Sequence, residues 1–285
     1  MTLLEAITLG VVQGLTEFLP VSSTAHLRVI PALLGWKDPG AAYTAVIQCG
    51  TLAAVVAAMW GDIVGLLRGF LAGLRSGRPW ETVESRVSIL IVLGTIPIVV
   101  TGFAFKHLIE GEARRLDVVV AALLAATLLM TVAEVAVTLR ARRGREGRSG
   151  LGGVTTADGV SMGMAQVLAL IPGMSRSGVT ISSGMLGGLD RRTAARFSFL
   201  LSLPAVAAAG LLEAWQEREG IFGAADGATA VVAGTLAAAV VGYAAIRWLL
   251  AMLGSRSLWP FIVYRLLLAA LLAWGLLSAR LPAVG

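Results

Sequence analysis

Long apolar segments alternate with short polar segments along the whole chain. A helix needs about 20 consecutive apolar residues to cross the hydrocarbon layer of a membrane, and six segments come close to that length. These predicted spans cover residues 41–60, 87–105, 117–139, 194–214, 228–250 and 258–279. The pattern therefore predicts an all-α polytopic membrane protein.

Two further apolar regions, residues 3–35 and 154–190, are interrupted at their centres by polar residues next to a proline. The first interruption reads "LPVSSTAH" and the second reads "IPGMSRSG". Because proline ends or kinks a helix, each region is expected to form a short helix, a break and a second short helix. We interpret both regions as re-entrant hairpins, which enter and leave the membrane on the same side.

Basic residues gather between the predicted spans and set the expected orientation. The predicted loop 61–86 contains four arginines and the segment 140–153 contains five, so both are expected on the cytoplasmic side. The loop 213–220 is acidic on balance and is expected outside. With this orientation the first hairpin opens to the outside and the second opens to the cytoplasm.

The predicted elements occur twice in the same order. Residues 1–139 contain one hairpin and three spans, and residues 154–285 contain a second hairpin and three spans. The basic cytoplasmic linker 140–153 joins them. Because three is an odd number of spans, the second copy is turned over, and the sequence predicts two inverted-topology repeats in a single transmembrane domain.

The two hairpin regions also resemble each other in sequence. "GVVQGLTEFLPVSST" (10–24) aligns with "GMAQVLALIPGMSRS" (163–177) when one residue is gapped, which pairs Gln13 with Gln166 and pairs the two prolines. Irregular backbone at membrane depth is tolerated only beside protein or a water-filled cavity. The two breaks are therefore expected to face each other across a polar pocket.

The composition supports a membrane protein. Of the 285 residues, 57% are hydrophobic and 14% are charged, whereas a soluble domain has roughly 25% charged residues. The net charge of +6 does not indicate a nucleic-acid partner, because the arginines lie in the short segments that orient the spans. The single cysteine, Cys49, excludes an intramolecular disulfide.

The first hairpin concentrates polar side chains at the expected membrane depth. Glu17 is an ionisable group inside an apolar segment, which is energetically expensive and indicates function, and it shares one helix face with Gln13. The alternative is that Glu17 pairs with an arginine for structure and that the hydroxyls cap the next helix. The candidate residues here are Gln13, Glu17, Ser22, Ser23, Thr24 and His26.

The second hairpin offers hydroxyl groups around one arginine. Hydroxyls and amide N–H groups at the start of a helix, beside a guanidinium, suit the oxygens of a phosphate group. The alternative is an arginine that only neutralises Glu17, and the two roles are compatible. The candidate residues here are Ser175, Arg176, Ser177 and Thr180.

The two sets of side chains together indicate phosphoryl transfer. A serine would attack phosphorus, His26 would transfer protons, and Arg176 would stabilise charge on the phosphoryl oxygens. Glu17, with Gln13 as a second ligand, is expected to hold a divalent cation, Mg²⁺ or Ca²⁺. One carboxylate is too few for a metal site built from protein alone, so this cation is expected to bridge to the substrate's pyrophosphate oxygens.

The segments "GLTEFLPVSSTAH" and "PGMSRSGVT" resemble the two signature motifs of the integral-membrane undecaprenyl-diphosphate phosphatases, the bacitracin-resistance proteins. The resemblance continues through "IQCGTLAAVV" (47–56), "GTIPIVV" (94–100), "DRRTAARFSFLLSLP" (190–204) and "FIVYR" (261–265), so it covers nearly the whole chain. It implies a bacterial inner-membrane enzyme that removes the terminal phosphate of a C55 isoprenyl diphosphate. This reaction regenerates the lipid carrier of cell-wall synthesis and confers bacitracin resistance. The polyprenyl diphosphate and membrane lipids are then the expected partners, and the active site is expected to open to the periplasmic or extracellular side.

The motif positions also imply roles for individual residues. Ser23 is the implied nucleophile, with Ser22 beside it, and His26 is the implied acid or base. Arg176 is the implied phosphate clamp, and Glu17 is the second acidic position of the E/Q-x-x-x-E motif. At the first position some members have Glu where this chain has Gln13, which weakens any metal site with two carboxylates. The remaining implied substrate contacts are Thr24, Ser175, Ser177 and Thr180.

Two other functions compete with this interpretation. A lipid flippase or secondary transporter would use the same inverted repeats, but transport alone does not require a serine, a histidine and an arginine grouped together. The acid-phosphatase type of membrane lipid phosphatase needs Lys…Arg-Pro and Ser-Gly-His motifs, which the sequence lacks. The sequence does not fix the oligomeric state, and a homodimer stays open.

Three further polar residues receive mainly structural interpretations. His107 lies next to Lys106 in a predicted loop and is expected to be a surface histidine. Arg265, inside the last predicted span, is expected to form a structural ion pair or to snorkel, with contact to the substrate as the alternative. Glu134 is expected to pair with the arginines of residues 140–143 at the cytoplasmic interface.

Overall fold

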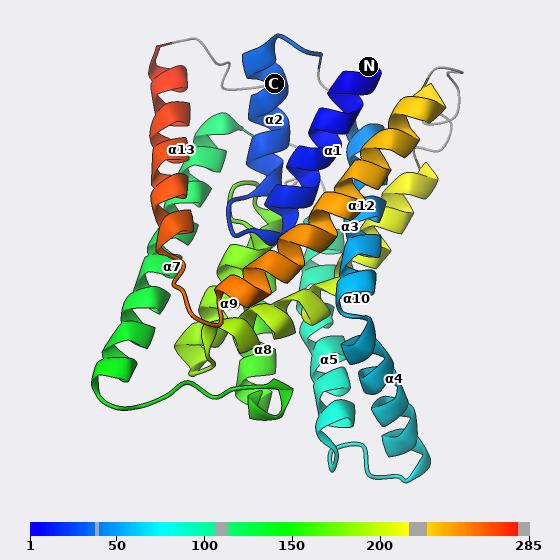
Figure 1. Ribbon diagram of the computed structural model, residues 1–285, viewed down its shortest axis with the longest axis vertical. Helices are drawn as coiled ribbons and strands as arrows, with labels where there is room; N and C mark the ends of the chain where they lie inside the picture. Colours follow the sequence, from blue (N-terminus) through cyan, green and yellow to red (C-terminus); the bar gives the residue numbers. More distant parts are fainter. Residues whose placement is uncertain (38–39, 106–112, 114, 217–226, 279–285) are drawn as a thin grey trace.

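The chain folds as a bundle of helices (Figure 1). The computed structural model describes residues 1–37, 40–105, 113, 115–216 and 227–278. Within these residues it contains helices and no strand. The predicted all-α class is confirmed.

Both interrupted regions form two helices around a break. In the first region α1 (Leu3–Phe18) is followed by α2 (Ser23–Leu34). In the second region α8 (Thr156–Val167) continues into a 3₁₀ turn, η3 (Leu168–Leu170), and α9 (Arg176–Gly187) follows the break. The prolines and the small polar residues therefore interrupt the helices where the sequence predicted.

Long helices occupy all six predicted spans. Five of them, α5, α7, α10, α12 and α13, are long and apolar enough to cross a membrane, and α3 meets that test only together with the helix that follows it. The chain is therefore a multi-pass membrane protein. The helices are α3 (Gly40–Ala58), α5 (Val83–Ala104), α7 (Leu116–Arg142), α10 (Arg191–Gln216), α12 (Gly227–Met252) and α13 (Trp259–Leu277).

The segment predicted as the loop 61–86 is largely helical. Helix α4 (Trp60–Arg75) follows α3 after a bend of 75°, and it packs on α5, where the Ser88 hydroxyl donates to the Leu66 carbonyl at 3.0 Å. The loop prediction was wrong here because it rested on the arginines alone. The apolar residues between them recur at helical spacing, so the arginines lie along an amphipathic helix.

Exposed apolar side chains cover the outward faces of the long helices. Phe103, Leu128, Val240 and Leu267 are between 66% and 72% exposed. In a soluble protein such large contiguous apolar surface would be unusual, whereas lipid solvates it readily. These faces identify the surface in contact with the hydrocarbon layer.

Glycines bring the first helix of each hairpin into close contact with a long helix. A Cβ at Gly10 of α1 would lie 2.1 Å from the Gly234 carbonyl oxygen of α12, and a Cβ at Gly163 of α8 would lie 2.5 Å from the Gly94 Cα of α5. Only glycine allows two helix backbones to approach this closely. Each hairpin thus packs against a long helix from the other half of the chain.

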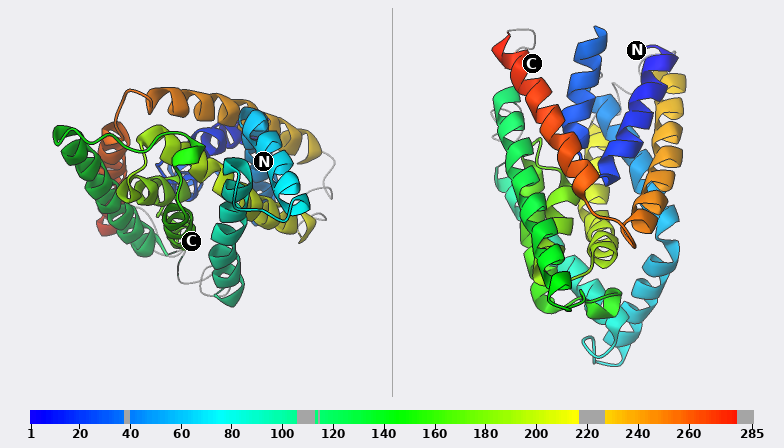
Figure 2. Two further views of the ribbon diagram at one scale, coloured as in Figure 1. Left: turned by 90° about the horizontal axis from the view of Figure 1, so that it is seen from below. Right: turned by 60° about the vertical axis from the view of Figure 1, so that its left-hand side comes forward.

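The two hairpins enter the bundle from opposite ends. Figures 1 and 2 show α1 and α2 descending from one end, while the linker before α8 lies at the other end. We call the two breaks, together with the first residues of the helix that follows each, the tips of the hairpins (residues 19–24 and 171–177). The tips meet at mid-height, where the Ser177 hydroxyl donates to the Leu19 carbonyl at 3.2 Å. This arrangement is consistent with the predicted inverted repeats.

Candidate active site

A serine with an unusual backbone conformation stands at the tip of each hairpin. Ser22 has φ 76° and Ser175 has φ 63°, and within the described chain they are the non-glycine residues with positive φ. Each precedes the first residue of the second hairpin helix. Non-glycine residues in such conformations are strained and concentrate at functional sites.

The two tips repeat the same side-chain contact. The Ser22 hydroxyl lies 3.2 Å from the Thr24 hydroxyl, and the Ser175 hydroxyl lies 3.3 Å from the Ser177 hydroxyl. When Ser22 is paired with Ser175, Gln13 precedes Ser22 by the same number of residues as Gln166 precedes Ser175. The tips therefore correspond without the gap that the sequence alignment used to pair the two prolines.

Glu17 connects the two tips through its carboxylate. Its Oε1 atom accepts a hydrogen bond from the Arg176 Nη2 atom at 2.7 Å. Its Oε2 atom accepts from the Ser23 hydroxyl at 2.8 Å and from the Gln13 amide at 3.2 Å. Both side chains of the ion pair are 11% exposed, so solvent screens the pair little.

The contact between Ser23 and Glu17 has chemical consequences. The serine hydroxyl directs its proton to a carboxylate, which is the arrangement of a nucleophile beside a general base. The Arg176 guanidinium binds the other carboxylate oxygen of Glu17. The Glu17 carboxylate is therefore within reach of the proton that nucleophilic attack by Ser23 would release.

A cavity of about 190 Å³ lies between the two tips. Helices α3, α5, α8 and α10 complete its wall through Gln48, Ile98, Gln166 and Ala205, among others. Four of the predicted residues do not line it, namely Gln13, His26, Ser177 and Thr180. The predicted residues that line it are Glu17, Ser22, Ser23, Thr24, Ser175 and Arg176.

Three of these four residues lie behind the cavity wall and contact residues that line it or support it. Gln13 donates to Glu17. Ser177 bridges to the backbone of the first tip. The Thr180 hydroxyl donates to the Arg176 carbonyl at 2.7 Å and lies 2.6 Å from the Ser198 hydroxyl. They support the tips rather than face the cavity.

His26 also lies behind the first tip. Its Nδ1 atom is 2.7 Å from the Ser22 carbonyl oxygen, and its Nε2 atom is 2.5 Å from the Tyr264 hydroxyl. Since a carbonyl only accepts, Nδ1 carries a proton, and in the neutral imidazole Nε2 accepts from the tyrosine. His26 therefore reaches the cavity through the Ser22 backbone, and its role as the acid or base stays a prediction.

Several buried polar atoms around the cavity have no hydrogen-bond partner among the described residues. They are Arg176 Nη1, Gln13 Oε1, and both amide atoms of Gln166. Gln166 is fully buried and lines the cavity. Buried polar groups are normally paired, so the atoms of Arg176 and Gln166, the two of these residues that line the cavity, are in place to meet a ligand. The sequence had marked Gln166 only as the repeat counterpart of Gln13.

Arg265 forms hydrogen bonds with the backbone of both tips, although it was expected to form an ion pair or to snorkel. It is fully buried and forms no ion pair with a described carboxylate. Its guanidinium donates to the carbonyls of Pro20 at 3.4 Å and Gly173 at 3.0 Å, one on each tip. It also donates to Thr127 at 2.9 Å and to the Leu123 carbonyl at 3.1 Å, both on α7. The prediction of a structural role fits these contacts, but the predicted ion pair was wrong, because the partners are backbone carbonyls and a threonine hydroxyl.

Glu134 also has a different partner from the predicted one. Its carboxylate binds Arg191 at the start of α10 and accepts from the Leu258 amide at 3.1 Å. The arginines of 140–143 lie further along α7, which remains helical to Arg142, so Glu134 faces the neighbouring helix instead. His107 lies outside the described residues.

The donor set of the site limits how it could hold a metal ion. Glu17 is the one carboxylate that lines the cavity, and no group of three metal-ligating side chains occurs within the described residues. The unpaired Gln13 Oε1 atom lies close behind Glu17. A cation that takes most of its ligands from substrate oxygens fits this set, and a cation held by protein alone does not.

Comparison with known proteins places the chain in a family. The sequence model of the family described as "Bacitracin resistance protein BacA" matches residues 6–271. The chain belongs to the BacA family. A BacA-family relative from Chlorobaculum tepidum, named undecaprenyl-diphosphatase, is 50% identical over 268 residues, which cover 94% of this chain and 95% of the relative. Relatives of the same name from Chlorobium limicola and Chloroherpeton thalassium are 48% and 46% identical over 99% of this chain and all of their own length.

Proposed function

We propose that this chain is an undecaprenyl-diphosphatase, which hydrolyses a polyprenyl diphosphate in the membrane to the monophosphate and inorganic phosphate. The observation that carries the proposal is the hydrogen bond from Ser23 to Glu17 in a cavity that also contains Arg176. The relatives named undecaprenyl-diphosphatase supply the substrate class. Recycling of the lipid carrier of cell-wall synthesis and bacitracin resistance are the biological roles that follow from it.

The arrangement supports a two-step reaction. The Ser23 oxygen attacks the terminal phosphorus while Glu17 takes the hydroxyl proton, and a phosphoserine forms. The bond from phosphorus to the bridging oxygen breaks, and Glu17 passes the proton it took from Ser23 to the leaving lipid monophosphate. Water then attacks the phosphoserine while Glu17 takes one of its protons. The bond from phosphorus to the Ser23 oxygen breaks, and Glu17 gives the proton to that oxygen as phosphate leaves.

Arg176 and the hydroxyls supply binding and charge stabilisation. The unpaired Arg176 Nη1 donates to an oxygen of the terminal phosphoryl group, while Nη2 remains on Glu17. The hydroxyls of Ser22, Thr24 and Ser175 line the same cavity and donate to the remaining oxygens. His26 keeps its predicted acid or base role, and its contacts indicate that it acts on Ser22 and Tyr264.

Gln166 extends the predicted set of substrate contacts. Its amide has both a donor and an acceptor without a partner among the described residues, and it faces the cavity. We assign to it a hydrogen bond from Nε2 to a diphosphate oxygen. Mg²⁺ or Ca²⁺, held by Glu17, Gln13 and substrate oxygens, would neutralise diphosphate charge when bound.

The membrane setting accommodates the substrate. A diphosphate head group reaches the cavity between the tips while the isoprenyl chain stays in the hydrocarbon layer beside the exposed apolar faces. The bacterial inner membrane is the proposed location. The first hairpin opens outside by the charge rule, so we propose that the head group enters from the periplasmic or extracellular side.

The experiment is release of inorganic phosphate from farnesyl diphosphate by the purified full-length protein with Mg²⁺ or Ca²⁺. Ser23→Ala and Arg176→Ala are expected to abolish turnover while the protein keeps its size-exclusion profile. Thr44→Val is a matched control, because among the described residues the Thr44 hydroxyl has the Gly40 carbonyl as its partner, and Thr44 does not line the cavity. Absence of phosphate release combined with lipid movement across vesicles would favour the flippase or transporter instead.

A further inference from the structure

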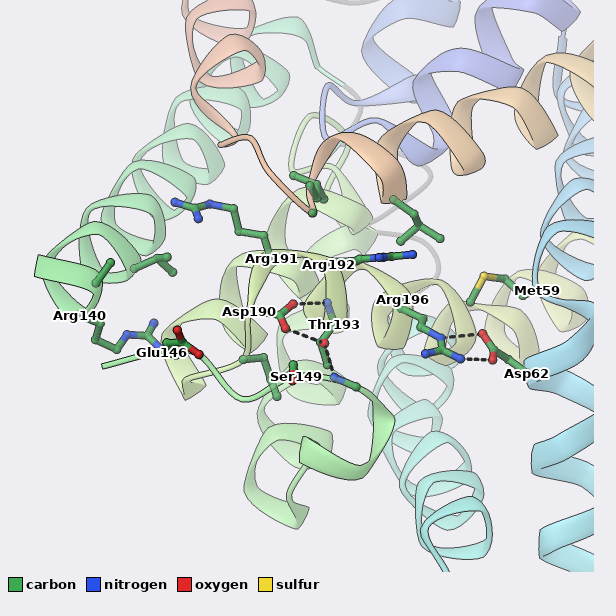
Figure 3. Close-up of a pocket in the computed structure, with 18 of the residues that line it drawn as sticks. Met59, Asp62, Arg140, Glu146, Ser149, Asp190, Arg191, Arg192, Thr193 and Arg196 are labelled. Carbon is green, nitrogen blue, oxygen red and sulfur yellow. Dashed lines mark hydrogen bonds and ion pairs between the residues drawn. The ribbon is translucent and has the colours of Figure 1, made fainter. Parts of the chain in front are cut away.

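A second and larger cavity lies away from the hairpin tips. It has a volume of about 1280 Å³ and is bounded by the end of α7, the linker after it, the start of α10 and the end of α12, together with the start of α4 (Figure 3). On α10 the lining residues of the two cavities that lie nearest in sequence are Arg196, of this cavity, and Ala205, of the tip cavity. At the rise of an α-helix these two residues are about 14 Å apart. The two cavities are separate sites.

Positive charge exceeds negative charge on the wall of this larger cavity. Six arginines and three carboxylates line it. Figure 3 shows Arg191, Arg192 and Arg196 following one another along α10, with Asp62 at one side. Asp62 accepts a hydrogen bond from Arg196 Nε at 2.8 Å.

The other carboxylates leave much of this charge uncompensated. Asp190 accepts a hydrogen bond from the Thr193 amide at 2.7 Å. Its carboxylate therefore caps the start of α10 and does not pair with an arginine. Glu134, from outside the lining, binds Arg191. Arg140 donates to the backbone carbonyl of Met185. Glu146 is the remaining carboxylate.

Besides Arg140, which binds a backbone carbonyl, three arginines of the wall have no ion-pair partner among the described residues. They are Arg145, Arg192 and Arg247, from the linker, α10 and α12. All three are exposed to the cavity side of the protein or to solvent, so they are free to rearrange around an anion. Cations held in one cavity repel one another, and a multivalent anion relieves that repulsion.

We propose that this cavity binds a phosphate-bearing anion. The planar guanidinium fork matches phosphate oxygens in bidentate pairs, and three uncompensated guanidiniums suit a dianion better than a carboxylate. The volume of about 1280 Å³ exceeds the roughly 1,000 Å³ of a large ligand pocket, so the cavity has room for a phosphorylated head group as well as for free phosphate. The ligand arrives either as inorganic phosphate or as the phosphomonoester head group of a lipid, and this proposal does not depend on the diphosphatase activity.

The first arm of the test measures free phosphate. Full-length protein in phosphatidylcholine nanodiscs is titrated with inorganic phosphate by calorimetry, in an Arg176→Ala background that removes phosphate binding at the tips. Adding Arg192→Gln and Arg247→Gln is expected to weaken binding by about tenfold or more, because charged hydrogen bonds to the anion are lost. The control pair Arg142→Gln and Arg143→Gln removes equal charge from the end of α7 outside the cavity lining and is expected to stay within about twofold.

The second arm measures the lipid source. The same proteins in nanodiscs of phosphatidylcholine with one-fifth phosphatidic acid are analysed by native mass spectrometry for retained phosphatidic acid. If the Arg192→Gln and Arg247→Gln protein no longer retains phosphatidic acid while the control pair does, the ligand is the lipid phosphomonoester. If the cavity variant weakens only the binding of inorganic phosphate in the first arm, the ligand is free phosphate. Equal behaviour of both variants in both arms, or no saturable binding in either, overturns the proposal.

Folding and activity are checked separately. With Arg176 intact, the Arg192→Gln and Arg247→Gln protein is expected to release phosphate from farnesyl diphosphate at the wild-type rate. If the double variant aggregates, Arg247→Gln alone is compared with Arg143→Gln. The proposal then requires that Arg247→Gln weakens phosphate binding more than Arg143→Gln does. A protein that binds phosphate at this cavity but hydrolyses no diphosphate would retain this proposal and remove the proposed function.

Discussion

Replacing Gln166 by leucine is expected to change stability and activity in opposite directions. Gln166 is fully buried, and both atoms of its amide lack a partner among the described residues. A buried unsatisfied polar group costs about 1–3 kcal/mol, and leucine has a similar volume without polar atoms. Gln166→Leu is therefore expected to stabilise the folded protein by roughly 1–3 kcal/mol in the absence of substrate.

The same substitution removes the hydrogen bond that we assign to the diphosphate. A hydrogen bond to a charged group contributes about 1.5–3 kcal/mol, which corresponds to a decrease of roughly 10- to 150-fold in kcat/KM. The assay combines thermal unfolding in detergent with phosphate release from farnesyl diphosphate over a range of substrate concentrations.

Gln13→Leu is the matched comparison, because Gln13 is the counterpart of Gln166 in the first hairpin. Its amide donates to Glu17 at 3.2 Å, so its loss is expected to destabilise the protein or leave stability unchanged. A lower melting temperature for Gln166→Leu, or a kcat/KM within twofold of wild type, would refute the reasoning about Gln166.

Four further results are expected, each from phosphate release with farnesyl diphosphate. Glu17→Gln is expected to lower kcat by about 10²- to 10⁴-fold, since it removes the general base beside Ser23. His26→Ala is expected to lower kcat, and Tyr264→Phe is expected to lower it less, because the phenylalanine removes only the donor to Nε2. Arg265→Met is expected to lower kcat by about 10- to 100-fold with a smaller change in KM, because the tips lose their shared donor. EDTA is expected to abolish turnover, and adding Mg²⁺ or Ca²⁺ in excess is expected to restore it.

Each of these results has a contrary outcome. Full activity of Glu17→Gln would remove Glu17 as the base, and equal loss in His26→Ala and Tyr264→Phe would place the essential proton on the tyrosine. Loss of folding in both Arg265→Met and Arg265→Lys would make Arg265 structural rather than positioning. Turnover that persists in EDTA would remove the cation from the mechanism.

The long helices were predictable because hydropathy acts locally. Each of the six predicted spans coincides with a helix within a few residues, since burying about 20 apolar residues in lipid requires backbone hydrogen bonds within the segment. Helix α4 was missed because its arginines were counted as loop charge. Its amphipathic spacing was present in the sequence, but the bend of 75° after α3 depends on packing against α5.

The residues of the candidate site were largely predictable because polar side chains at membrane depth are conspicuous. Glu17, Ser23 and Arg176 do line one cavity. Which side chain contacts Ser23 was not predictable, because Glu17 and His26 are both within a few residues of it. The fold turns Glu17 toward the serine and His26 toward Tyr264, a residue 238 positions away.

The sequence by itself determined the membrane-spanning helices, the two interrupted hairpins and the polar residues at their tips. These follow from local rules, namely the apolar length needed to cross a bilayer and the effect of proline on a helix. Only the tertiary structure decided that Arg265 binds a carbonyl of each tip, that Gln166 faces the cavity unpaired, and that the arginines of α10 and α12 share a second cavity. These features join segments far apart in the chain, and their hydrogen bonds and charges are fixed by the packing of whole helices.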